Sequence, residues 1–414
     1  MKLFFKRLVF IISVVPALAA GIFVFGGWAK KLPRGTEVNG VDVGGMPLSC
    51  AAACVREDIL RDLKGRRLEV RCGDNVYAFS YPEISFKDNV ASVISSVRKA
   101  GQYRAEVKYY LNGLDTVVSG ICAAEFREIQ EPQAYFNGGS GEPFSYDEGH
   151  NGAVAEGGKL RRDMLSSLEN RGYGEDFAPV ELCLKITRPK GSVSALKRKT
   201  VRISAYTTYF DGSNAPRVSN IKLAGSKISG CVLGVNQSFS FNTRVGARTV
   251  QNGFKRAKII EDGRFVYGTG GGVCQVSTTL YNAVLLAGLK VTEFHPHSLA
   301  VSYVSPSRDA MVSGTYSDLK FTNTTNSPVY IRILTGADYI KCEVYGMNSG
   351  AEYSLDSVVV GEEAGALKSE CYMNITRGGV TERKLIRKDK YLPAKNDAPQ
   401  SSQKQQPAEK TAND

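Results

Sequence analysis

Hydrophobic and polar positions divide the chain into three regions with different periodicities. An uncharged apolar run extends from Leu8 to Trp28. In the following region, apolar residues at helical spacing alternate with short runs of period two. After about residue 200, period-two segments dominate, with a single long apolar helix pattern among them. The pattern predicts an α+β protein with an N-terminal transmembrane anchor, a small α+β repeat region and a strand-rich α+β domain with one central helix after a Gly-rich turn.

The repeat region reads as two helix-and-strand units. The first helix starts at Ser49 as N-cap, and its predicted buried positions are Ala52, Val55, Ile59 and Leu63. Further elements are expected as strands at 38–46, 68–81 and 105–111, a helix at 90–100, and a second unit with a helix at 160–170 and a strand at 180–186. Residues 137–158 are rich in Gly, Ser, Glu and Asp and predict a loop. The Pro, Gly and basic stretch at 188–199 predicts a domain boundary.

The C-terminal half predicts a sheet. Strands are expected at 201–210, 318–322, 328–334 and 339–345, with Thr335–Asp338 turning the last two into a hairpin, and 221–250 reads as turns. Strand-like runs continue to about Leu392, and a Gln-, Ser- and Lys-rich tail follows. We therefore expect a leader and anchor at 1–34, a repeat region at 35–188, a strand-rich α+β domain at 200–348, a strand-rich extension at 349–394 and a disordered tail at 395–414.

The N-terminal run predicts the location of the protein. It is long enough to span a bilayer core of about 30 Å. A cleaved signal peptide is the alternative, with a cleavage site among Ala17, Ala19 and Ala20, but the run exceeds the usual h-region of about 7–15 residues. We favour an uncleaved anchor in the cell membrane. The short basic leader then stays in the cytoplasm, and the later domains lie outside, on the cell-wall side.

Composition narrows the class of partner. Of 414 residues, 43% are hydrophobic and 23% charged, which excludes a wholly disordered, collagenous or multi-pass membrane protein. The net charge of +12 favours an anionic neighbourhood, and an extracytoplasmic location makes wall polymer or lipid a better partner than nucleic acid. The nine cysteines are an odd number, so at least one is unpaired within the chain. No protein partner is indicated.

The candidate chemistry begins in the segment GTGGGVCQVSTTLYNAVLLAG, residues 268–288. Glycines lead into a helix that ends at Gly288, and Cys274 falls in its first turn. Unpaired N–H groups and the helix dipole there lower a thiol pKa and favour a thiolate nucleophile. Gly270, Gly271 and Gly272 would allow close substrate approach and N–H contacts to an oxyanion. No phosphate-binding glycine motif is complete here.

Candidate acid–base residues follow in EFHPHS and SPSRDA. Alternation would turn His295 and His297 to one side, where either can exchange a proton with Cys274. Arg308 is a candidate to bind a substrate carboxylate, and the Asp309 carboxylate is a candidate to orient a histidine. The alternative is that the two residues form an ion pair at the surface. A zinc site made by Cys274 and the two histidines is a competing interpretation, but no paired metal-ligand spacing supports it. We expect no metal and no cofactor.

These residues carry a resemblance to a known family. The segments FSFNTRVGARTVQNGF, GGGVCQVSTTLYNAVLLAGL, HPHSLAVSYV, RDA and DLKFTNTTNSPVYIRI resemble the VanW domain across about residues 239–347. The region with GVDVGGM is similar to the peptidoglycan-binding repeats that precede such domains. The resemblance implies an L,D-transpeptidase with Cys274 as nucleophile and His297 as its histidine, and relates the protein to glycopeptide-resistance clusters. Phe294 departs from the Arg that many relatives have before the HPHS segment.

The resemblance and the residues together predict a mechanism. Cys274 attacks the carbonyl between the diamino acid of a peptidoglycan stem peptide and its terminal D-Ala. His297, assisted by His295 and Asp309, protonates the departing D-Ala, and an amine of a second stem then forms a 3–3 cross-link. Gln275 and Ser277 are assigned to substrate binding. The alternatives are hydrolysis at the same site, a zinc-dependent amidase, and a non-catalytic wall-binding or scaffold protein in which the GGGVCQ helix is merely packed.

Overall fold

The computed structural model describes residues 30–393 except 262 and 315. The expected anchor, Leu8–Trp28, and the tail from residue 395 lie outside the described residues. Within the described range, no helix is long and apolar enough to cross a bilayer. The structure is an α+β fold rich in strands, and all nine cysteines fall in the described range and are free.

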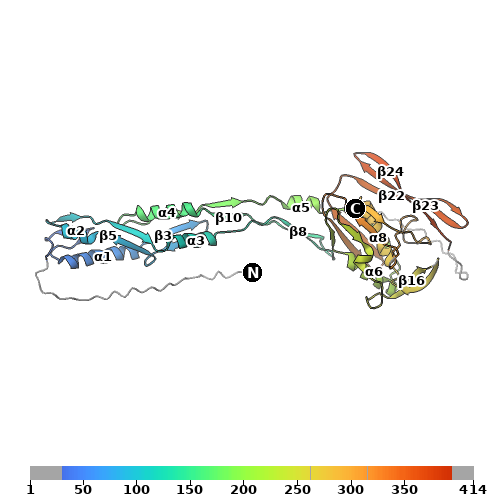
Figure 1. Ribbon diagram of the computed structural model, residues 1–414, viewed down its shortest axis with the longest axis horizontal. Coiled ribbons are helices and arrows are strands. Elements are labelled where there is room, and N and C mark those ends of the chain that lie inside the picture. Colours follow the sequence, from blue (N-terminus) through green and yellow to red (C-terminus); the bar gives the residue numbers. More distant parts are fainter. Residues whose placement is uncertain (1–29, 262, 315, 394–414) are drawn as a thin grey trace. The chain divides into compact units, whose positions relative to one another are not determined.

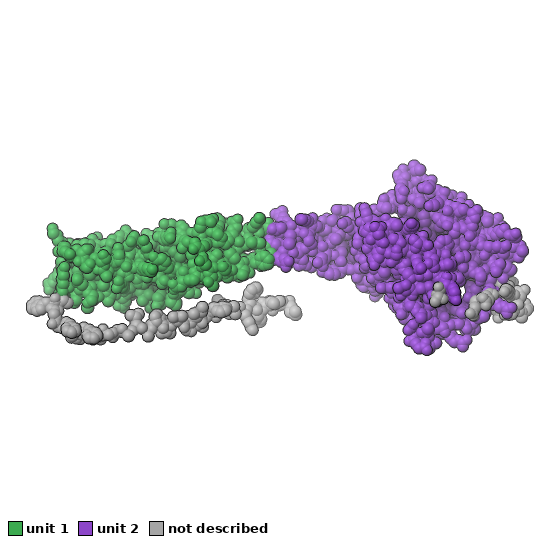
Figure 2. Space-filling model, in the orientation of Figure 1, with its two compact units in different colours: residues 1–127, 153–186 green, residues 128–152, 187–414 purple. Residues whose placement is uncertain are grey.

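The chain divides into two compact units that are each discontinuous in sequence (Figures 1 and 2). Unit 1 comprises residues up to Arg127 together with Ala153–Ile186, and unit 2 comprises Glu128–Gly152 and everything after Ile186. The chain therefore leaves unit 1, contributes a short segment to unit 2, returns, and leaves again. Residues 128–152 lie within the range that the sequence pattern groups with the repeats.

Unit 1 contains two hydrophobic cores. Its elements are β1 (Thr36–Val38), β2 (Val41–Asp42), α1 (Leu48–Lys64), β3 (Leu68–Cys72), β4 (Asn75–Phe79), β5 (Ile84–Asp88), α2 (Val90–Ser96), β6 (Gly101–Tyr103), β7 (Val107–Leu111), α3 (Leu114–Ala124), β10 (Gly152–Ala155), α4 (Gly157–Glu169), β11 (Val180–Glu181) and β12 (Leu184–Thr187). Ala52, Val55 and Ile59 of α1 belong to one core, and Leu63 at its end belongs to the other. The predicted apolar face of α1 is confirmed.

Unit 2 is built on an antiparallel sheet in the order β13-β21-β20-β14. Its elements are β8 (Gln133–Phe136), β9 (Phe144–Asp147), α5 (Val193–Lys199), β13 (Val201–Tyr209), α6 (Ala215–Ile228), β14 (Cys231–Leu233), β15 (Ser238–Ser240), α7 (Phe241–Val245), β16 (Arg256–Glu261), β17 (Arg264–Thr269), α8 (Val273–Leu286), β18 (Lys290–Glu293), β19 (Lys320–Thr322), β20 (Val329–Thr335), β21 (Tyr339–Gly346), β22 (Glu352–Glu363), β23 (Ala366–Arg377) and β24 (Val380–Tyr391). The predicted hairpin of β20 and β21 is confirmed.

Helix α8 is the centre of unit 2. It contacts β13 and β21 of the main sheet, α6, β18, and β22 of the C-terminal sheet β22-β23-β24. Of its 14 residues, all but Cys274 and Leu286 are buried. The sequence pattern predicted a one-sided apolar stripe, whereas the polar positions of this helix are buried as well. They are satisfied by hydrogen bonds to neighbouring segments, as described below.

The face of the main sheet away from α8 is covered by the hairpin of β8 and β9. Alternation along β20 directs Ile331 and Ile333 into the core and Tyr330 and Arg332 to the opposite face. There the Phe144 ring lies 5.0 Å from the Tyr330 ring between centroids. Arg332 donates to the carbonyls of Gly139, at 2.9 Å, and Gly141, at 2.5 Å, in the hairpin loop. The inserted segment is thus part of unit 2.

Three local predictions are wrong. Residues 221–250, expected as turns, contain most of α6, whose start is capped by the Asn214 side chain and whose buried side includes Ile221, Ala224 and Ile228. Residues 137–158, expected as a loop, contain β9 and β10. Pro47, not Ser49, is the N-cap of α1. Helix α6 matters for function because it carries a residue of the pocket described next.

The hairpin cover leads to a first prediction. We expect Phe144→Ala to lower the free energy of unfolding of unit 2 by about 1–3 kcal/mol, because it removes ring contacts with Tyr330 and Tyr345. Chemical denaturation followed by fluorescence measures it. Tyr135→Ala on the same hairpin is the control, since Tyr135 is 51% exposed. Equal effects of the two changes would show that the hairpin does not stabilise the sheet.

Candidate functional site

The glycine turn before α8 is required by the fold itself. Gly270 and Gly272 have φ of 90° and 107°, in the region that favours glycine. Gly271 has no such angle, but a Cβ there would lie 2.6 Å from the carbonyl oxygen of Lys258 on β16. Backbone conformation and close packing therefore explain all three glycines without a substrate. Their effect is to expose backbone N–H groups at the start of the helix.

Cys274 is the second residue of α8 and faces a pocket. Its side chain is half-buried, and Sγ lies 3.4 Å from the Val312 carbonyl oxygen. Among the described residues, the backbone N–H groups of Gly271, Gly272 and Cys274 have no acceptor in the protein. These donors lie in the turn that leads into the residue carrying the thiol, at the positive end of the helix dipole. They are available to an oxyanion formed at a carbonyl that the thiol attacks.

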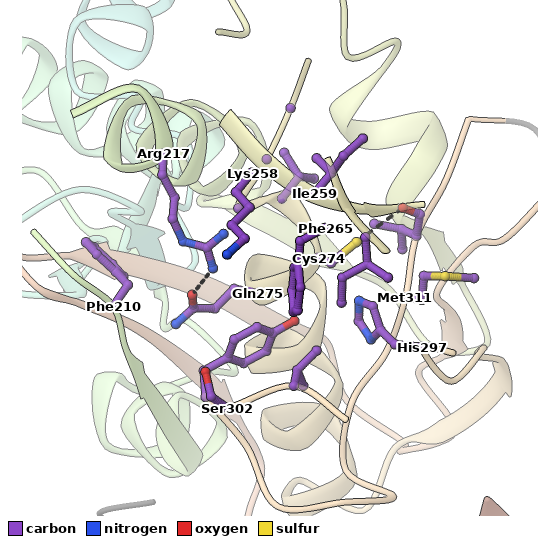
Figure 3. Close-up of a pocket in the computed structure, with 18 of the residues that line it drawn as sticks. Phe210, Arg217, Lys258, Ile259, Phe265, Cys274, Gln275, His297, Ser302 and Met311 are labelled. Atoms are coloured by element: carbon purple, nitrogen blue, oxygen red, sulfur yellow. Dashed lines mark hydrogen bonds between the residues drawn. The ribbon is translucent and has the colours of Figure 1, made fainter. Parts of the chain in front are cut away.

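His297 and Asp309 form a buried pair beside the thiol. The Nδ1 atom of His297 lies 2.6 Å from Oδ2 of Asp309, and the backbone N–H of His297 donates to the same oxygen at 2.7 Å. The two side chains are 5% and 1% exposed. Asp309 thus fixes both the ring orientation and the tautomer of the histidine, which leaves Nε2 for the thiol. In Figure 3 the His297 ring is close to the sulfur of Cys274.

Electrostatics favours a charged cysteine–histidine pair. Burial alone would raise the pKa of Cys274, but the hydrogen bond and positive charge of His297, with Arg248 further away, lower it below its usual value. Burial alone would lower the pKa of His297, whereas hydrogen bonds to Asp309 and Cys274 raise it to about 9. Burial opposes ionisation of Asp309, but His297 and Arg387 hold its pKa below the ordinary value. The shifts of the two groups therefore both act toward a thiolate and an imidazolium, relative to the same groups free in solution.

The C-terminal sheet completes the surroundings of Asp309. From β24, the Tyr391 hydroxyl donates to Oδ1 of Asp309 at 2.5 Å, and Arg387 donates to its carbonyl oxygen at 2.6 Å. Nη2 of Arg387 lies 3.3 Å from the same Oδ1, and Nε of Arg387 is 2.6 Å from Asp389. The carboxylate is thus compensated on both oxygens, as a buried charge requires.

The thiol opens into a pocket of about 740 Å³ (Figure 3). The volume falls in the range of ordinary ligand sites. Its walls come from the segment after β13, from α6, from the β16–β17 hairpin, from the start of α8 and from the loops at 297–303 and 311–314. Besides Cys274, Gln275, His297 and the glycines 270–272, the lining includes Phe210, Asp211, Arg217, Arg248, Lys258, Ile259, Phe265, Tyr303 and Met311.

The structure separates the candidate residues of the sequence into two groups. Cys274, His297 and Asp309 come together, with the three glycines beside them. His295 does not join them: its Nε2 lies 3.1 Å from Glu293, and it is absent from the pocket lining. The expectation that both histidines face one side is wrong because β18 ends at Glu293, before the alternation reaches them. The three ligands of the alternative zinc site therefore do not converge.

Gln275, Ser277 and Arg308 have structural contacts. Ser277 is fully buried and donates to the carbonyl of Ala310 at 2.5 Å, outside the pocket lining. Arg308 is 5% exposed and donates to Asn282 at 3.0 Å, so it does not reach the pocket as a carboxylate clamp. Gln275 lines the pocket but is 1% exposed, and its amide is engaged by protein groups. It positions a neighbour, Arg217, as discussed later.

Sequence reasoning missed residues on both sides of the site. Arg217, Arg248, Lys258 and Tyr303 line the pocket, and Arg387 and Tyr391 hold Asp309. A period-two reading of RKDKY would have placed Arg387, Asp389 and Tyr391 on one strand face, which is the observed arrangement. Phe294 lies outside the pocket lining, and its ring centroid is 4.8 Å from the Arg387 guanidinium.

Comparisons with known proteins agree with the predicted domain. Residues 216–345 match the family model described as VanW like protein. An uncharacterized protein of Bacillus subtilis (strain 168), YoaR, is 42% identical over 161 residues, which cover 39% of this chain and 53% of that protein. The match thus spans about half the length of this relative. No solved structure matches significantly. The family match contains Cys274, His297 and Asp309 and ends before β24.

The contact of Asp309 with His297 predicts how the thiol titrates. Asp309→Asn removes the charge that helps raise the pKa of His297, so the imidazolium should lose its proton at lower pH. Without that positive charge beside it, the Cys274 thiol should ionise only at higher pH. We expect the pH profile of Cys274 alkylation, read by mass spectrometry of its peptide, to move to higher pH. Asp211→Asn, in the same pocket, is the control. An unchanged profile in Asp309→Asn would contradict the assignment.

The contact of Tyr391 with Asp309 predicts a cost in stability. Tyr391→Phe leaves a buried carboxylate oxygen and the backbone N–H of Ser307 each without one partner. We expect the free energy of unfolding to fall by about 1–3 kcal/mol. Tyr372→Phe on the adjacent β23 is the matched control, because its hydroxyl bonds only the peripheral Glu370. Chemical denaturation compares the two. A loss in Tyr372→Phe as large as in Tyr391→Phe would argue against a specific role of the Asp309 contact.

Proposed function

Because residues 216–345 match the VanW family model and the pocket joins a thiol, an imidazole and a carboxylate, we propose that the protein is a cysteine-dependent L,D-transpeptidase that forms 3–3 cross-links in peptidoglycan. The observation that carries the proposal is the Cys274–His297–Asp309 arrangement at the start of α8. A thiol that only packed in the core would need no buried histidine and carboxylate beside it. The reaction class is acyl transfer.

The first half-reaction is thiolate attack on the carbonyl of the diamino acid that precedes the terminal D-Ala. A C–S bond forms, and the carbonyl electron pair moves to oxygen, where the free N–H groups of Gly271, Gly272 and Cys274 can donate. Collapse of this intermediate breaks the C–N bond. The proton on Nε2 of His297 goes to the leaving amine, and D-Ala departs with a thioester left on Cys274. Asp309 stabilises the imidazolium before this transfer.

The second half-reaction returns the site to its starting state. The side-chain amine of a neighbouring stem attacks the thioester and gives its proton to the now neutral His297. The C–S bond breaks, Cys274 leaves as a thiolate, and the new amide is the 3–3 cross-link. Water as acceptor would make the same site a carboxypeptidase. The acceptor decides between the two outcomes, and both begin from the same acyl-enzyme.

We further propose that the protein acts on the cell-wall side of the membrane, held by the segment Leu8–Trp28. The net charge of +12 supports retention near anionic wall polymer, and unit 1 is the candidate for wall binding. No cofactor is needed, because attack, proton transfer and release are all carried by the residues named above.

Removal of the nucleophile tests the proposal. We expect full-length Cys274→Ala to lose D-Ala release and cross-linked dimer formation from muropeptides, a drop of about 10³-fold or more. Both products are measured by mass spectrometry. Cys50→Ala, which removes an exposed thiol on α1, is the control and should retain activity. Equal product from Cys274→Ala and the unaltered protein would exclude the cysteine mechanism and favour a wall-binding scaffold.

A further inference from the structure

The pocket contains a second group of charges away from the thiol. Arg217 projects from α6 and Lys258 from β16, and both line the pocket. In Figure 3 their charged ends point toward one another beside Gln275, whereas His297 lies at the other end beside Cys274. We call Arg217 and Lys258 the basic pair. The pocket thus has a reactive end and a cationic end.

Arg217 is held in place by a buried amide. Its Nη2 donates to Oε1 of Gln275 at 2.7 Å. The Gln275 Nε2 atom in turn donates to the Thr208 hydroxyl at 3.0 Å and to the Tyr209 carbonyl at 2.8 Å. The amide cannot turn without losing these bonds, so the guanidinium is fixed before any ligand binds. A pre-positioned fork of N–H donors suits a planar anion.

The basic pair has no anionic partner in the described protein. Apart from Glu261, whose side chain lies outside the described part of the structure, no carboxylate among the described residues lies within 4.0 Å of Arg217, Lys258 or the nearby Arg248. Asp211 also lines the pocket, but its carboxylate already accepts from the Ser213 hydroxyl at 2.7 Å and its N–H at 2.9 Å. Instead, Nζ of Lys258 lies 4.4 Å from the centroid of the Phe265 ring. Cations in a pocket that do not contact a carboxylate favour an anionic ligand.

We propose that the basic pair binds a carboxylate in the acyl part of the donor peptide, the part that remains on Cys274, which rests on the function proposed above. The leaving amine must come within hydrogen-bond reach of His297 to receive its proton, so D-Ala lies at that end. The retained peptide then extends along the rest of the pocket, where Arg217 and Lys258 lie. Arg248 is not included, because it donates to Asn242 and acts electrostatically on Cys274.

The group that binds the basic pair is a carboxylate on the residue that precedes the diamino acid, whose carbonyl is attacked. In a stem whose second residue is D-glutamate joined through its γ-carboxyl, the α-carboxylate is free and projects from the retained part. When this α-carboxylate is amidated, it loses its negative charge and presents N–H donors to the two cations. The site therefore distinguishes free from amidated stems.

Binding to the full-length Cys274→Ala protein tests the inference without turnover. The probes are two synthetic tetrapeptides that end in D-Ala and differ only in the second residue, with a free or an amidated α-carboxylate. By calorimetry we expect the free form to bind about tenfold more tightly or better. Equal affinities, tighter binding of the amide, or no binding of either peptide would overturn the inference.

Charge-removing variants locate the effect. In the same background, Lys258→Met should abolish most of the preference for the free carboxylate and leave affinity for the amidated peptide within about twofold. Arg217→Met should do likewise. Lys255→Met is the matched control, since Lys255 is an exposed lysine three residues away and outside the pocket lining. A loss of the same size in Lys255→Met, or an unchanged preference in Lys258→Met, would overturn it. Failure of the catalytic proposal would appear separately, as absence of a thioester on unaltered Cys274.

Discussion

The site depends on one buried charge, the carboxylate of Asp309. At 1% side-chain exposure it cannot remain ionised without compensation. Compensation comes from the ring and the backbone N–H of His297 on one oxygen and from Tyr391 on the other, with Arg387 beside it. Without these partners, burial would favour the neutral acid. The pKa of His297 would then fall, because no negative charge would stabilise its imidazolium, and the thiolate of Cys274 would have no counter-ion. The charge state of Cys274 is thus coupled, through His297 and Asp309, to Tyr391.

Helix α8 places both ends of this chain of interactions. Its first turn presents Cys274, and its buried polar side chains hold the loop that carries Asp309. Thr278 accepts from the backbone N–H of Ala310 at 3.0 Å, and Asn282 donates to the carbonyl of Arg308 at 2.8 Å. A helix with polar residues buried on several sides is costly unless each is paired. Here the pairing holds the loop with Asp309 against the helix that carries Cys274, which explains why the helix is not simply apolar.

The sequence predicted what local physics determines and missed what depends on distant partners. Glycines followed by an apolar helix predicted Cys274 at a helix start, and alternation predicted the hairpin of β20 and β21. Arg308 and His295 do not lie where the sequence pattern placed them. No local signal shows that Arg308 donates to Asn282 or that β18 ends at Glu293, before His295. Arg387 and Tyr391 lie about 80 positions from Asp309. Helix α6 was missed because its buried side has only two large apolar residues, Ile221 and Ile228, and the other buried positions are Asn, Ala and Gly, which carry a weak apolar signal.

The cations of the pocket have a further consequence for the thiol. Arg248 lowers the pKa of Cys274 directly, and Arg217 and Lys258 add positive potential to the same partly dry space, where screening by salt is weaker than at the surface. The overall charge of +12 does not have this effect, because most of it is exposed and distant. Under the proposed function, a cationic pocket favours two anions at once, the thiolate and a carboxylate of the donor. The donor would neutralise part of the positive potential around Cys274, so a His297–Asp309 pair that holds its own proton would keep the thiolate charged after the donor binds.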